Sequence, residues 1–275
     1  MKKRLLFQVL LPLVAVLLVF AGCKDDNGDP EAPAGKLVFN FHHTVDGAAV
    51  TFDSAGYVNE AGNVYEVNEI QYFISDVTLH RTDGGKVVLD KENDIYYIDT
   101  DIPATKRWQV FDAIPEGSYT GITFTFGISE QKNKSFMFVN PPEVNMVWPE
   151  FLGGGYHYLK LNGKFEEEIG GTVYLRPFNY HMGIGQIYDP PTSTHPDSIV
   201  GFVQNYFEVE LPNSGFTIAK DQTVEVDVIM QVEEWFKNPN IWDHHYWGNF
   251  TMQNQAAMQA MKENGEHVFI VGEIK

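Results

Sequence analysis

Apolar and polar residues alternate with a period of two along most of the chain after residue 36. In residues 222–232, four valines and Met230 alternate with polar residues such as Glu225 and Asp227. Such alternation predicts strands with one packed face and one solvated face. The segments with this pattern are 37–43, 64–81, 86–98, 118–128, 155–166, 171–180, 200–211, 216–219, 222–232 and 267–273.

Helical spacing of apolar residues occurs in one segment only. Thr251 could cap a helix over Met252–Glu263, and Asn264-Gly265 would end it. Three long connections remain, at 129–154, 182–199 and 234–251, and loops of that length in a compact domain are usually functional. The pattern predicts an all-β fold, a β-sandwich with long loops and one short C-terminal helix, over residues 37–275.

The first 22 residues have the layout of a secretory signal peptide. Three basic residues, Lys2, Lys3 and Arg4, precede an apolar run from Leu5 to Gly22. The run ends at Phe20-Ala21-Gly22-Cys23, which resembles a lipobox, and Cys23 is the only cysteine of the chain. We therefore predict a lipoprotein signal over residues 1–22 and attachment of lipid to Cys23.

Residues 23–36 are polar and contain proline and glycine, which predicts a flexible tether. The run Lys24-Asp25-Asp26 resembles the export signal of surface-displayed lipoproteins. We expect the protein to be held in the outer-membrane lipid through Cys23, with the domain facing the cell surface.

Charge and missing motifs narrow the classes of function. The net charge is −18, and it becomes −21 once the three basic signal residues are removed. An acidic surface disfavours nucleic acid and is compatible with cations. Walker-type loops, G-x-S-x-G, H-E-x-x-H and C-x-x-C are absent, and a single cysteine permits no internal disulfide. We expect no enzyme and no catalytic residues.

Histidines are the side chains that carry candidate chemistry. There are nine, and imidazole is a favoured ligand of copper and zinc. His157 shares a strand face with Leu159 and Leu161, and His181 closes the strand that ends at Tyr180. For His157, a buried histidine bonded to backbone is the alternative to a metal ligand.

The loop 234–251 supports a second hypothesis. Its aromatic and histidine residues, Trp242, His244, His245 and Trp247, could form a surface on which a ligand stacks. In that case the chain would be a glycan-binding module of an outer-membrane uptake system. Buried aromatic residues would give the same composition.

Several short motifs resemble those of one family in sequence order. They are Met146-Val147-Trp148-Pro149, Gly155-Tyr156, Lys160-Leu161-Asn162-Gly163 and His181-Met182-Gly183, with supporting stretches at 69–79, 126–128 and 252–254. Together they resemble the methanobactin-associated copper-binding protein (MbnP-like) family over most of residues 37–272.

The resemblance implies a periplasmic or surface β-sandwich that binds a single copper ion. We expect a role in metal acquisition or handling, with an outer-membrane transporter as a candidate partner. The resemblance also implies that a tryptophan, here Trp148, is oxidised to kynurenine by a dihaem peroxidase-like partner. Trp148 and His181 match the family motifs, and His42 on the first strand is a further expected ligand. With His157, these residues form the predicted metal site. An indole nitrogen has no lone pair for a metal, so metal affinity should depend on the modification.

The chain also departs from the family pattern. Family members often carry a cysteine pair, one of them after the His-Leu-Gly motif, where this chain has Ile184-Gly185-Gln186. Pro149 directly after Trp148 also differs from some members. The loop at residues 184–186 must therefore be held by contacts other than a disulfide.

Overall fold

The computed structural model describes residues 32–90 and 94–275. The predicted signal peptide, Cys23 and most of the tether lie outside the described residues. Residues Pro33–Lys275 form one compact unit. None of the helices in the described part of the chain is long and apolar enough to span a membrane.

The smaller of the two main sheets has six strands and is built around the N-terminal strand β1. In it, β1 pairs in parallel with β16, which places Phe39 opposite Val226. The β1 strand begins at Ala34, inside the range expected for the tether, because its first residues pair with β8. The strands of this sheet are β1 (Ala34–Val45), β2 (Ala48–Ala49), β7 (Arg107–Gln109), β8 (Ile114–Pro115), β16 (Thr223–Gln231) and β17 (Phe269–Ile274).

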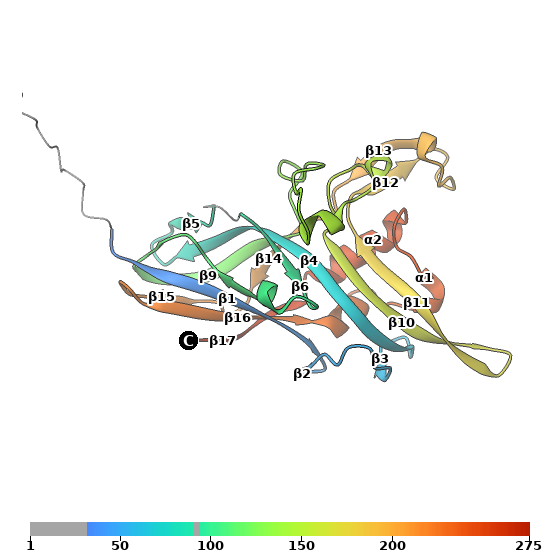
Figure 1. Cartoon of the computed structure of the whole chain (residues 1–275), viewed down its shortest axis with the longest axis horizontal. Coiled ribbons are helices and arrows are strands. Elements are labelled where there is room, and N and C mark those ends of the chain that lie inside the picture. The colour runs from blue at the N-terminus through green and yellow to red at the C-terminus, as the bar shows by residue number, and fades with distance from the viewer. Residues whose placement is uncertain (1–31, 91–93) are drawn as a thin grey trace, which may run out of the picture. The chain divides into compact units, whose positions relative to one another are not determined.

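The larger sheet has nine strands, with β4 as its long central member. Its main path runs β11-β10-β4-β9-β14, so that β11, β10 and β4 lie side by side (Figure 1). The main strands are β4 (Val64–Arg81), β9 (Gly117–Phe126), β10 (Leu159–Ile169), β11 (Thr172–Met182) and β14 (Phe207–Leu211). The shorter ones are β3 (Tyr57–Val58), β5 (Lys86–Val88), β6 (Ile95–Asp99) and β15 (Phe216–Ile218).

The core forms where the inner faces of the two sheets meet. Tyr72 of β4 and Phe126 of β9 contact Phe269 of β17, with ring centroids 6.1 and 5.5 Å apart. All three side chains are buried, as the alternation of apolar residues requires. The predicted β-sandwich is confirmed.

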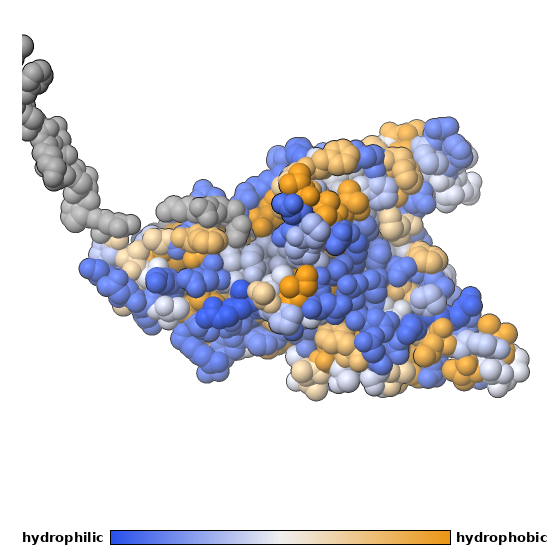
Figure 2. Space-filling model, viewed as in Figure 1, coloured by the Kyte–Doolittle hydropathy of each residue, from blue (hydrophilic) through white to orange (hydrophobic). Residues whose placement is uncertain are grey.

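Two hairpins extend from the sandwich. Segment 200–211, expected as one strand, is divided into β13 (Ile199–Val203) and β14, and β13 pairs with β12 (Gly185–Tyr188) outside the main sheets (Figure 1). The other hairpin is the outer half of β10 and β11, whose tip exposes Val173, Tyr174 and Leu175 (Figure 2).

The helix predicted near the C-terminus is α2 (Gln255–Gly265), and it begins later than expected. Its N-cap is Asn254, whose side chain accepts a hydrogen bond from Ala257 N. Thr251 instead fastens β11, since its hydroxyl bonds the backbone of His181. The other helices are short: α1 (His244–Trp247), η1 (Pro103–Lys106), η2 (Glu143–Met146), η3 (Glu150–Leu152), η4 (Pro196–Ser198) and η5 (Val232–Phe236).

Candidate metal site

The loop before β10 folds back on itself and places Trp148 inside the protein. Trp148 N donates to Gly155 O at 2.8 Å, which closes the turn. Gly155 has a φ of +77°, and a Cβ there would lie 2.4 Å from Asn133 Oδ1. The glycine therefore allows both the left-handed backbone and the close approach of Asn133.

The indole of Trp148 is fully buried, with 0 % of its surface exposed. Its Nε1 donates to Leu152 O at 3.1 Å. Its six-membered ring lies against Gly183, where a Cβ would come within 2.7 Å of Cε3. The glycine of the His181-Met182-Gly183 motif thus makes room for the tryptophan of the other motif.

His157 lies directly beside this indole. The two ring centroids are 4.6 Å apart, with 75° between the ring planes. His157 Nδ1 is 2.9 Å from Met146 O, and because a carbonyl oxygen only accepts, Nδ1 carries the proton. Nε2 is left with a lone pair, is buried, and has no partner among the described residues. The hydrogen bond to backbone that was the alternative for His157 is therefore observed, but it engages only Nδ1 and leaves Nε2 available.

His181 completes the cluster from β11. Its ring centroid is 5.1 Å from that of His157, with 87° between the planes. Its Nε2 is 2.8 Å from Asn162 Oδ1. Its Nδ1 is buried and has no hydrogen-bond partner within residues 32–90 and 94–275. Two imidazole nitrogens without partners among the described residues therefore belong to adjoining rings, and one of these rings, that of His157, lies against Trp148.

Burial keeps both imidazoles neutral. Desolvation holds the pKa of His157 well below its ordinary value, and the neighbouring His181 and Lys160 lower it further. Desolvation, followed by the charge of Lys160, lowers the pKa of His181 to about 3. Neutral imidazole is the form that binds metals, so both side chains are ready as ligands at neutral pH.

His42 is not brought together with these residues, which corrects the expected ligand set. It lies opposite Ile229 in the six-stranded sheet, its side chain is 52 % exposed, and its Nε2 is 3.6 Å from Asp227 Oδ1. Of the His, Cys, Asp and Glu side chains in the described ranges, only Glu69, Asp99 and Asp101 form a group of three or more with ligand atoms within 4.8 Å. Neighbouring residues of a strand point to opposite faces, and on β1 it is His43 that is buried.

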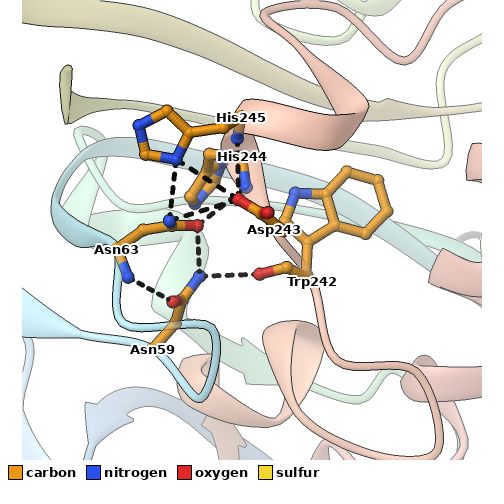
Figure 3. A network of polar contacts seen from close by, with 6 residues as sticks. All are labelled: Asn59, Asn63, Trp242, Asp243, His244 and His245. Carbon is orange, nitrogen blue, oxygen red and sulfur yellow. Dashed lines mark hydrogen bonds and ion pairs between the residues drawn. The ribbon is translucent and has the colours of Figure 1, made fainter.

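The structure buries two of the four residues that the second hypothesis assigns to a stacking surface. Trp242 and His244 are buried, and Trp242 stacks on Trp247 with centroids 5.0 Å apart. Polar contacts fix this loop to residues 59–63 (Figure 3). Asn59 Nδ2 donates to Trp242 O, and Asn63 Oδ1 accepts from His244 N, each at 2.8 Å. Trp242 and His244 therefore have a structural role, whereas His245 is exposed and Trp247 is partly exposed.

Sequence reasoning missed Asn162, which contacts His181 from the neighbouring strand β10. It stands at the variable position of the Lys-Leu-x-Gly motif, so the motif itself gave no signal. Its role depends on the pairing of β10 with β11 and β4, which brings His181 and Glu69 to either side of it.

Comparison with known proteins gives two matches. The family model described as MbnP matches residues 34–257. Among solved structures, MbnP from Methylosinus trichosporium is similar at 17% sequence identity, with a TM-score of 0.43, covering 70% of this chain and 75% of that chain. No curated protein matches the chain.

Proposed function

The chain belongs to the MbnP family, and on that premise we propose that it binds one copper ion between His157 and His181, beside an oxidised Trp148. The observation that supports the proposal is that His157 Nε2 and His181 Nδ1 are both buried and have no hydrogen-bond partner in the described part of the chain. An unsatisfied buried polar group costs about 1–3 kcal/mol, and coordination to one metal ion would satisfy both.

The donor set suits copper. Neutral imidazoles are ligands for copper and zinc, and a given nitrogen site binds copper(II) more tightly than zinc(II). Within the described residues no cysteine and no carboxylate joins the two histidines within 4.8 Å, so the set is rich in nitrogen. Each imidazole is also held through its other nitrogen, as metal-binding histidines usually are.

Trp148 lies against His157 and is the proposed third ligand, but without modification its indole cannot coordinate a metal. Its Nε1 is a donor with no lone pair and already donates to Leu152 O. Oxidative cleavage of the indole C2–C3 bond, with a peroxide or dioxygen as oxidant, and hydrolytic loss of C2 as formate would give kynurenine, whose aniline nitrogen can coordinate. We propose that a dihaem peroxidase-like partner supplies this oxidation, and that tight copper binding requires it.

Hydrogen bonds take the place of the absent cysteine pair in holding the loop beside Trp148. Gln186 Nε2 donates to Leu152 O at 2.8 Å and also to Ile184 O. Leu152 O is the same oxygen that accepts from Trp148 Nε1. The Ile184-Gly185-Gln186 departure is therefore compatible with a fixed site.

We further propose that the protein handles copper as a binding protein and not as an enzyme. Export and attachment through Cys23 would place the domain at the outer membrane, facing the cell surface. There it would collect copper or pass it to an outer-membrane transporter.

Copper titration of the purified protein, matured with its oxidising partner, tests the proposal. The wild-type protein should bind one copper ion per chain. His157→Ala and His181→Ala should each lose more affinity than the roughly 10–100-fold that removal of an outer-shell partner costs. His80→Ala is the control, because His80, near the end of β4, contacts Thr123 of β9 and neither proposed ligand. Wild-type affinity in both His157→Ala and His181→Ala would place the copper site elsewhere.

A further inference from the structure

Asn162 of β10 lies behind His181 and connects it to a carboxylate on the next strand. Asn162 Nδ2 donates to Glu69 Oε2 at 3.0 Å, and Gln71 Nε2 donates to Glu69 Oε1 at 2.9 Å. His181 belongs to β11, and Glu69 and Gln71 belong to β4; these two strands flank β10 (Figure 1).

The carboxylate fixes the orientation of the amide. An ionised carboxylate only accepts hydrogen bonds, so the NH2 group of Asn162 must face Glu69. The carbonyl oxygen of Asn162 then faces His181, at 2.8 Å from Nε2. Gln71 also donates to Asp99 Oδ2 at 3.0 Å, which ties Glu69 to the buried end of β6.

The amide in turn fixes the tautomer of His181. If the proton were on Nδ1, the lone pair of Nε2 and the oxygen of Asn162 would face each other at hydrogen-bond distance. With the proton on Nε2, the same contact is a hydrogen bond, and Nδ1 keeps its lone pair. Nδ1 is the atom that lies buried without a partner among residues 32–90 and 94–275.

We infer that Asn162, oriented by Glu69, is a positioning residue that holds His181 in the one tautomer able to bind a metal through Nδ1. This inference rests on the proposed copper site and identifies the residues that orient one of its ligands. The tautomer of His157 depends on the backbone oxygen of Met146, which no side-chain substitution removes. Asn162 is therefore the position at which a substitution can change a tautomer and leave both ligands in place.

The direct test is the nitrogen NMR spectrum of the metal-free protein with labelled histidine, which distinguishes the two tautomers. The wild-type protein should show His181 with its proton on Nε2. Asn162→Leu removes the acceptor, so the Nδ1-protonated tautomer should appear. Asn162→Asp keeps an acceptor oxygen and should retain the wild-type tautomer. Asn179→Leu is the matched control, because Asn179 lies opposite Asn162 on β11.

Glu69→Gln is a second variant, in case Asn162→Leu does not fold. An amide at position 69 can donate as well as accept, so Asn162 is free to reverse its own amide. His181 should then populate both tautomers while every side chain keeps nearly the same volume.

Copper titration of the same variants, matured with the oxidising partner, completes the test. Affinity should fall about 10–100-fold in Asn162→Leu and remain close to wild type in Asn179→Leu. A wild-type protein with the proton on Nδ1, or Asn162→Leu and Glu69→Gln variants with an unchanged tautomer, would overturn the inference. So would a changed tautomer with unchanged copper affinity. If the tautomer follows Asn162 but the matured wild-type protein binds no copper, the control of the tautomer is supported and the proposed function fails.

Discussion

The imidazole rings of His157 and His181 meet almost at right angles, 87° between planes, with their centroids 5.1 Å apart. One residue precedes β10 and the other lies near the end of β11, and the antiparallel pairing of these strands brings the two together. In each ring one nitrogen is hydrogen-bonded to a fixed acceptor, and the other has no partner among residues 32–90 and 94–275.

Gly183→Ala should disturb the indole of Trp148. The added Cβ would lie 2.7 Å from Cε3, closer than side-chain carbons approach, so the ring or the strand must shift. We expect a loss of about 1–3 kcal/mol in the free energy of unfolding, measured with urea, and weaker copper binding. The control is Gly121→Ala, whose nearest atom would be 3.6 Å away. Equal stability and equal copper affinity in both variants would contradict the packing described.

His42→Ala should leave copper binding unchanged. The side chain is half-exposed and pairs at 3.6 Å with Asp227 on the six-stranded sheet. An exposed pair of this kind contributes roughly 0–1 kcal/mol to stability, so the variant should also fold normally. The measurement is the same copper titration, and a clear fall in affinity would return His42 to the ligand set.

The stability of the protein should fall as the pH drops below 6.5. Burial lowers the pKa of His43, His181 and His244 to about 3, and that of His157 well below 6.5. At a pH between 6.5 and the lowered pKa of each histidine, the unfolded chain binds protons that the folded protein does not. The stabilisation is complete above pH 6.5 and is lost as the pH falls toward the folded pKa. Each of these histidines should lower the free energy of unfolding by roughly 1.4 kcal/mol for each pH unit below 6.5.

His244→Phe isolates one of these contributions. His244 stacks on Phe178 with centroids 4.4 Å apart, and neither of its ring nitrogens has a partner in the described part of the chain. A phenyl ring removes two unsatisfied polar atoms and the site of protonation. Urea unfolding at several pH values should therefore give a smaller slope below pH 6.5 than the wild type. An unchanged slope would show that His244 is not held neutral by burial.

Cys23→Ala should release the protein from membranes. The lipobox-like run ends at the only cysteine of the chain, and a lipid there is the expected anchor. Fractionation of cells that produce the variant should move the protein from the membrane fraction to the soluble fraction. A variant that stays with the membrane would indicate another means of attachment.

The sequence predicted the architecture because burial on one face leaves a period of two along each strand. It did not predict where long segments divide: β13 and β14 lie in one segment that is predicted as a single strand, but they pair with different partners. The start of α2 was misplaced because Thr251 and Asn254 are both good capping residues. Only the fold shows that Thr251 is engaged with β11.

The candidate site was predicted in part. The short motifs led to Trp148 and His181, and strand alternation led to His157. His42 was expected from its strand alone, and its face could not be assigned from the sequence. The role of the aromatic loop was ambiguous because amino-acid composition does not show whether a tryptophan is buried or exposed. The structure buries Trp242. Asn162 and Glu69 are functional only through strand register, which no local pattern reveals.

The copper site is tested most directly by the X-ray absorption spectrum of the copper-loaded, matured protein and of its His157→Ala, His181→Ala double variant. We expect a first shell of nitrogen or oxygen ligands, with the outer-shell scattering of two imidazoles, and the loss of that scattering in the double variant. A shell that contains sulfur, or an imidazole signal that survives in the double variant, would contradict the proposed site.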